Sequence, residues 1–149
     1  MVKAVLVEED IAEGRRFLDA LREPTPTNGR KKSTSGGASH FRVKSAFWWY
    51  FPESEEWRLV IATPLVDEEG PLATYKDIQK ILARRPDLNL SLQSISVLSP
   101  KDERVRAFNK VLKGEPGLVS LRFTRGVLNG VYVDDAYVYR LPRTSGVKR

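Results

Sequence analysis

Residues 43–65 read VKSAFWWYFPESEEWRLVIATPL, and this stretch decides the fold. Two apolar runs rich in aromatic and β-branched residues, 43–51 and 57–65, flank the polar segment 52–56. Runs of this composition separated by a short polar loop are typical of paired antiparallel strands. We therefore expect a β-hairpin at the centre of the domain.

The five consecutive aromatic residues 47–51 cannot share one surface, because successive side chains of a strand point to opposite faces. If Phe51 pairs with Trp57, then Phe47 and Trp49 lie on a wholly apolar face, which must be core. The opposite face then carries Trp48, Tyr50, Arg58, Val60 and Ala62. Trp48 and Tyr50 have three alternatives here: a stacking platform for unpaired bases, an interface with another chain, or packing inside this chain.

Three segments have the apolar spacing of three and four residues that predicts amphipathic helices. The first covers about residues 4–22. The second begins at Gly70-Pro71, with proline at its first position, and ends at Arg84-Arg85-Pro86. The third follows Ser99-Pro100-Lys101-Asp102, with Ser99 as the cap, and ends at Lys113-Gly114.

The rest of the ordered sequence has strand character. Residues 91–98 alternate along one strand, and residues 118–141 form strands broken at Asn129-Gly130 and Asp134-Asp135. Asn-Gly between apolar flanks is a strong hairpin signal. The order α-ββ-α-β-α-ββ predicts one α+β domain over residues 1–149, with about three helices on a mostly antiparallel sheet of two hairpins and one further strand.

The net charge of +6 is concentrated in two places. Residues 22–44 carry +5 and residues 140–149 carry +4, which leaves −3 for the remainder. Residues 24–40 are rich in Gly, Ser, Thr, Lys and Arg, so we expect a flexible basic insertion there and a basic tail at about 142–149. The body of the domain is mildly acidic.

The candidate binding residues are basic side chains of the insertion and its flanks, together with the aromatic residues of the adjoining strand. Basic side chains of the insertion attract phosphates through counterion release, although a charge run is also typical of a solvated loop. Together with the aromatic sheet face, the candidates for binding nucleic acid or a protein partner are Arg30, Lys31, Lys32, Arg42, Lys44, Trp48, Tyr50 and Arg58.

The sequence lacks the common catalytic patterns. Absence of cysteine and a single histidine exclude disulfides, thiolate zinc sites and multi-histidine metal sites. No nucleophile elbow or Gly-rich phosphate loop is present. We predict no catalytic residue and no cofactor. The alternative is a Mg²⁺-dependent enzyme that processes phosphodiesters, and its clustered carboxylates would be Asp67, Glu69, Asp134 and Asp135.

The preferred interpretation is a non-enzymatic binding module. Its expected partner is another protein chain, a second copy of itself, or a polyanion such as nucleic acid. No apolar run is long enough to cross a bilayer or to form a signal-peptide core, so we expect no membrane association and a cytoplasmic location.

Overall fold

A computed structural model of the chain describes residues 5–23 and 41–141. The basic insertion predicted at 24–40, with Arg30, Lys31 and Lys32, lies outside the described residues, and so does the tail at 142–149. What the sequence analysis says of these segments stays a prediction.

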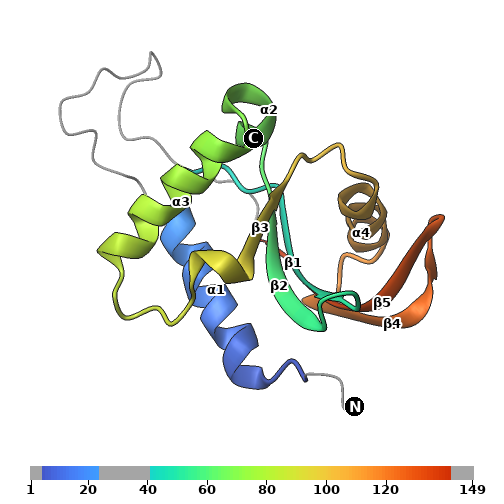
Figure 1. The fold of residues 1–149 in the computed structure, drawn as a ribbon. Helices are drawn as coiled ribbons and strands as arrows, with labels where there is room; N and C mark the ends of the chain where they lie inside the picture. Colours follow the sequence, from blue (N-terminus) through green and yellow to red (C-terminus); the bar gives the residue numbers. More distant parts are fainter. Residues whose placement is uncertain (1–4, 24–40, 142–149) are drawn as a thin grey trace.

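The elements follow the predicted order, with two short helical elements added, and one of them, η1, takes the first half of the strand predicted at 91–98 (Figure 1). They are α1 (Glu8–Arg22), β1 (Ser45–Phe51), β2 (Glu56–Ala62), α2 (Leu65–Glu69), α3 (Pro71–Arg84), η1 (Leu92–Ser94, a 3-10 helix), β3 (Ile95–Leu98), α4 (Glu103–Gly114), β4 (Ser120–Leu128) and β5 (Val131–Tyr139). The α+β class is confirmed, and the described part of the chain contains four α-helices where about three were expected.

The five strands form one sheet in the order β3-β2-β1-β5-β4. Three of the neighbouring pairs are antiparallel, whereas β2 and β3 are parallel. The sheet is therefore mixed. The reason is the helical connection through α2 and α3, because a helical crossover carries the chain back to start the next strand in the same direction.

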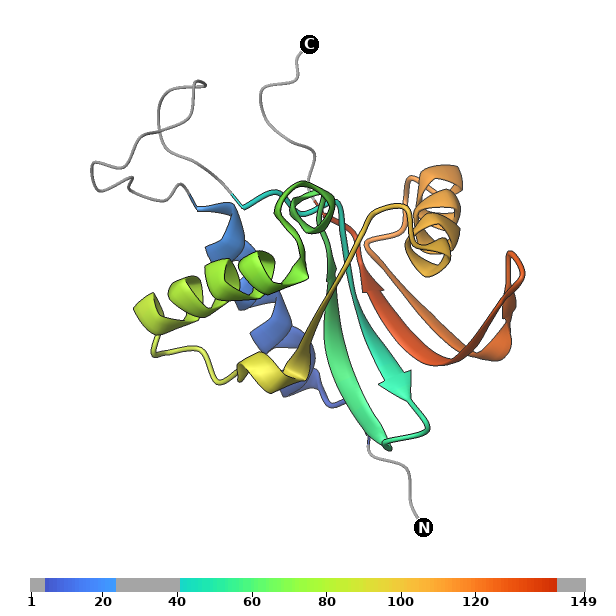
Figure 2. The ribbon, with the colours of Figure 1, turned by 45° about the horizontal axis from the view of Figure 1, so that its top comes forward.

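Helices cover both faces of the sheet. α1 and α3 lie on one side and α4 lies on the other (Figures 1 and 2). Two apolar clusters fill the space between the layers. The first contains Phe17, Leu21, Trp48, Leu59, Ile61, Ile78 and Tyr139. The second contains Phe47, Trp49, Val60, Phe108, Leu112 and Val138. Because both faces are buried, β1 and β2 can be almost continuously apolar.

The register predicted for the first hairpin is wrong by one residue. Phe51 pairs with Glu56 and Tyr50 pairs with Trp57, so the turn contains four residues and Glu55 adopts a φ of 54°. A shift of one residue exchanges the faces of a whole strand. Arg58 and its β2 neighbours Val60 and Ala62 consequently share the face of Trp49, and Trp48 shares its face with Leu59 and Ile61.

Two helices begin later than predicted. α1 begins at Glu8, where Val7 is the N-cap and its N–H donates to the Asp10 carboxylate at 3.2 Å. α4 begins at Glu103, because the Asp102 carboxylate accepts from the Arg104 N–H at 2.8 Å and so caps the helix in place of Ser99.

The second hairpin is confirmed. Asn129 and Gly130 have φ of 53° and 85°, as expected for a two-residue turn. At Asp134-Asp135 the strand continues, but the regular alternation of its side chains between the two faces is interrupted. Val133 and Ala136, three residues apart, pack in the same cluster. Arg125 on β4 has a φ of 44°. The hairpin curls towards α4 (Figure 2).

α1 reaches the sheet through a glycine. The Trp48 Nε1–H donates to the Tyr139 hydroxyl at 2.9 Å, and that hydroxyl donates to the Ile11 carbonyl at 2.7 Å. A Cβ atom on Gly14 would lie 2.3 Å from the same hydroxyl oxygen. Only a residue without a side chain permits this close approach.

Gly14→Ala should lower the free energy of unfolding by about 1–3 kcal/mol, because the added methyl group overlaps the Tyr139 hydroxyl. Tyr139→Phe removes the overlapping oxygen, so the double variant should lose less stability than the two single losses together. Chemical denaturation measures all three.

The matched control is Gly114→Ala at the end of α4, where a new Cβ atom would meet nothing within 4 Å. We expect this variant to keep or slightly raise the free energy of unfolding. A loss for Gly114→Ala equal to that for Gly14→Ala, or strictly additive losses in the double variant, would contradict the close approach of α1.

Candidate binding surfaces

The aromatic residues proposed for recognition are buried within the chain. Trp48 and Tyr50 are each 4% exposed. Trp48 bonds to Tyr139 under α1, and the Tyr50 ring lies 5.5 Å from the Trp57 ring. Of the three alternatives, the structure has packing inside the chain, because helices cover both faces of the sheet. The burial of Trp48 and Tyr50 therefore favours the third alternative over a stacking platform or an interface.

Arg58 lies on the other face of the sheet from Trp48 and Tyr50. Its guanidinium lies 5.3 Å from the Phe51 ring centre and donates to the Glu56 carboxylate at 2.7 and 2.9 Å. Arg104 stacks in the same way at 5.3 Å from Trp49 and bonds to Asp102. Both arginines already have a carboxylate partner. Their side chains pack on aromatic rings at the edge of the second apolar cluster, so they have a structural role.

Arg42 and Lys44 lie at the start of β1 and are exposed. The Arg42 guanidinium forms an ion pair with Glu68 on α2, and the Lys44 N–H donates to the Ala62 carbonyl at 2.8 Å. The structure therefore separates this pair from Arg58, which lies towards the other end of the hairpin. Among the described residues, the five predicted candidates Arg42, Lys44, Trp48, Tyr50 and Arg58 do not form one site.

Arg140, counted with the basic tail, has a structural role. Its guanidinium donates to the carbonyl oxygens of Leu112, Glu115 and Leu118. These carbonyls lie in the last turn of α4 and just after it, where a cation is favourable. The charge of Arg140 thus stabilises the fold and is not free to bind a ligand.

The carboxylates proposed for Mg²⁺ are not assembled. Asp67 accepts from the Ser99 hydroxyl at 2.8 Å, and Asp135 is held by the Arg122 guanidinium at 2.8 and 3.0 Å. Asp67 lies on α2, which follows the end of β2 opposite Ser45. Asp135 lies next to Ala136, which pairs with Trp49. Ser45 and Trp49 are four residues apart on β1, so the two carboxylates belong to positions about 13 Å apart along the strand. Among the residues that the structure describes, no three metal-ligating side chains come together.

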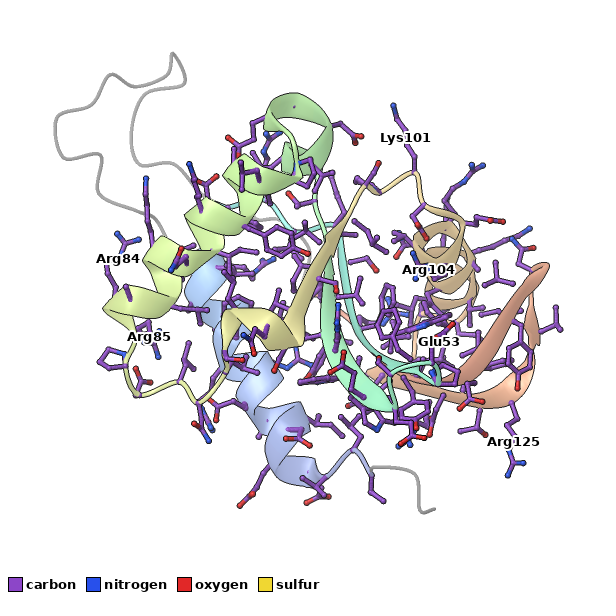
Figure 3. All side chains as sticks on the ribbon, viewed as in Figure 1. Glu53, Arg84, Arg85, Lys101, Arg104 and Arg125 are labelled. Carbon is purple, nitrogen blue, oxygen red and sulfur yellow. The ribbon has the colours of Figure 1, made fainter. Side chains whose placement is uncertain are left out.

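A basic stripe on α3 was missed by the sequence analysis. Lys76, Lys80 and Arg84 are exposed and four residues apart, so they follow one side of the helix. None of them forms an ion pair with another described residue. Figure 3 shows Arg84 pointing away from the body of the protein. The sequence contains the stripe as basic residues at positions i, i+4 and i+8 of the predicted helix. The net charge of a whole segment does not reveal this pattern.

The two attachment points of the insertion form ion pairs near opposite ends of the α2–α3 unit. Glu23, the last described residue before it, pairs with Arg85 at 3.5 Å at the end of α3. Arg42, just after it, pairs with Glu68 on α2. The described residues on both sides of the basic segment 24–40 therefore contact the α2–α3 unit, and α3 carries the stripe.

Two carboxyl groups meet at the corner between α2 and α3. A hydrogen bond with Asp77 raises the pKa of Glu69 from 4.5 to about 7, and partial desolvation and the charges of Asp77 and Glu68 act in the same direction. A shared proton relieves the repulsion between two such neighbours. The protonation of this corner consequently changes near neutral pH.

Comparison with protein families, curated proteins and solved structures gave no significant match. Within residues 5–23 and 41–141, no helix has the length and apolar character needed to cross a membrane. The function of the protein is therefore inferred from the surfaces described above.

The Glu69 corner predicts a pH-dependent stability. The folded state holds this proton more tightly than the unfolded chain does, so its contribution is complete below about pH 4.5 and is lost as the pH rises through about 7. Glu69→Gln keeps a neutral hydrogen-bonding group and should flatten the profile of unfolding free energy over this range.

Glu53→Gln makes the same change of charge in the exposed β1–β2 turn (Figure 3) and should keep the wild-type profile. Denaturation curves across the pH range compare the three proteins. A Glu69→Gln profile parallel to that of the wild type would contradict the shared proton.

Proposed function

We propose that this protein is a non-enzymatic binding module that holds a polyanion, such as nucleic acid, on the outer face of α3 and on the basic segment attached beside it. The observation that carries the proposal is the stripe of Lys76, Lys80 and Arg84, which has no ion-pair partner among the described residues. The buried face of the same helix, with Thr74, Ile78 and Ile81, fixes the stripe outward.

The spacing of the stripe suits a linear polyanion. Three cations at every fourth helical position span about 12 Å. Double-stranded DNA carries about seven phosphate charges over the same length of its axis. Flexible lysine and arginine side chains can therefore reach separate phosphates from a rigid support.

The charge of the remaining body supports a local site. Residues 5–23 and 41–141 together carry a net charge of −1, although the whole chain carries +6. The stripe is thus one of two groups of exposed cations on a nearly neutral body, and the other, Arg106, Lys110 and Lys113, lies on α4. The insertion at 24–40 adds Arg30, Lys31 and Lys32, and its two attachment points lie at the α2–α3 unit.

The type of recognition follows from the buried aromatic residues. Bases stack on exposed rings, whereas Trp48 and Tyr50 are covered. Phosphate contacts position a ligand but do not read its sequence. We therefore assign a salt-sensitive binding without sequence preference, and Trp48, Tyr50 and Arg58 have no direct part in it.

Replacement of Lys76, Lys80 and Arg84 by alanine together should weaken binding of a fluorescent DNA duplex about tenfold or more at low salt. Loss of three phosphate contacts should also reduce the slope of log affinity against log salt by about three. Alanine favours helix, so the fold should be retained. Fluorescence anisotropy over a salt series measures both quantities.

The matched control replaces Lys101, Lys110 and Lys113 by alanine, which removes the same charge from exposed positions around α4. This variant should keep most of the affinity and the slope. Equal losses for the two triple variants would show that only net charge matters. Absence of wild-type binding at about 50 mM salt would remove the polyanion proposal.

A further inference from the structure

The two edges of the sheet are treated differently by the fold. β3 is a short edge strand, and its Val97 N–H donates to the Tyr75 hydroxyl of α3 at 3.1 Å. A side chain of the covering helix thus satisfies an edge donor that would otherwise invite another strand. This is a common way of protecting a sheet edge.

β4 forms the opposite edge, and no described residue covers it in a comparable way. It spans nine residues, and its backbone pairs with β5 on one side. No further backbone hydrogen bond to residues 120–128 is present within the described part of the chain. Figures 1 and 2 show β4 on the outside of the sheet, with no helix along its outer edge.

Apolar side chains are exposed along the same hairpin. Val127 on β4 and Tyr132 on β5 are cross-strand partners and are 66% and 56% exposed. Val119, directly before β4, is 77% exposed. These three residues are half of the large exposed apolar side chains among the described residues. An apolar contact of this kind favours a protein partner.

The charge of the edge selects the kind of partner. β4 carries Arg122 and Arg125 and no acidic residue. Asp135 neutralises part of the Arg122 charge, but Arg125 has no ion pair with another described residue and points out from the hairpin (Figure 3). An incoming strand that carries carboxylates therefore meets a complementary charge.

We propose that the edge of β4 binds an extended, acidic segment of a partner protein as an added strand. Main-chain hydrogen bonds would supply affinity, and alternate side chains would supply specificity. The left-handed backbone at Arg125 interrupts the regular strand, so the docking edge is Ser120–Thr124, about 17 Å long.

Charge argues against two other occupants. Antiparallel pairing of two β4 strands brings Arg122 and Arg125 of both copies close together, and like charges across a pair are unfavourable. The chain's own residues 142–149 contain Arg143, Lys148 and Arg149 and no acid, so they repel the same edge.

The test uses two fluorescent synthetic peptides of equal length, one alternating valine with glutamate and the other alternating valine with lysine. The acidic peptide should bind, and the lysine peptide should not. Amide hydrogen exchange should slow in Ser120–Thr124 when the acidic peptide is present. Arg125→Glu should reverse the preference between the peptides, as measured by anisotropy.

The triple α3 variant without Lys76, Lys80 and Arg84 separates this site from the polyanion surface. It should retain binding of the acidic peptide, whereas loss of binding would place the peptide on α3 and overturn the proposal. Equal binding of both peptides, no binding of either, or unchanged exchange in β4 would also overturn it. A wild-type dimer protected at β4 would assign the edge to a second copy.

Discussion

The Tyr139 hydroxyl joins α1 to the centre of the sheet, and the arrangement of the other layers depends on this junction. The hydroxyl accepts from Trp48 and donates to the Ile11 carbonyl, while Gly14 allows the helix backbone to come close. Burial raises the pKa of Tyr139, so the group remains a neutral donor. The position of α1 in turn determines where the chain leaves the fold at Glu23, beside the end of α3.

Because helices cover both faces of the sheet, we expect ligands to bind at other surfaces of the domain. With α1 and α3 on one face and α4 on the other, the aromatic residues of β1 stabilise the core and present no ring to a ligand. The surfaces that we propose for partners are the outer face of α3 and the edge of β4, and both carry basic residues. Binding by charge and by backbone pairing suits a domain in which the aromatic residues Phe47, Trp48, Trp49 and Tyr50 of β1 are buried in the two cores.

Local signals predicted much of this fold. Pro71 begins α3, Asn129-Gly130 forms the turn between β4 and β5, and the element order agrees apart from α2 and η1. The register of the first hairpin was not predictable from alternation, because both faces of β1 are apolar and one turn residue decides it. Burial of Trp48 depends on helices distant in sequence. The α3 stripe was visible in the spacing of its residues, but its connection with the insertion required the contacts of Glu23 and Arg42.

Titration of ¹⁵N-labelled protein with duplex DNA at low salt, followed by backbone amide spectra, tests the central claim most directly. Our account predicts signal changes at Lys76, Lys80 and Arg84 and at both ends of the segment 24–40, with α4 unchanged. Changes confined to α4 or to the β4–β5 hairpin, or none with excess DNA, would contradict the assignment of α3 as the binding surface.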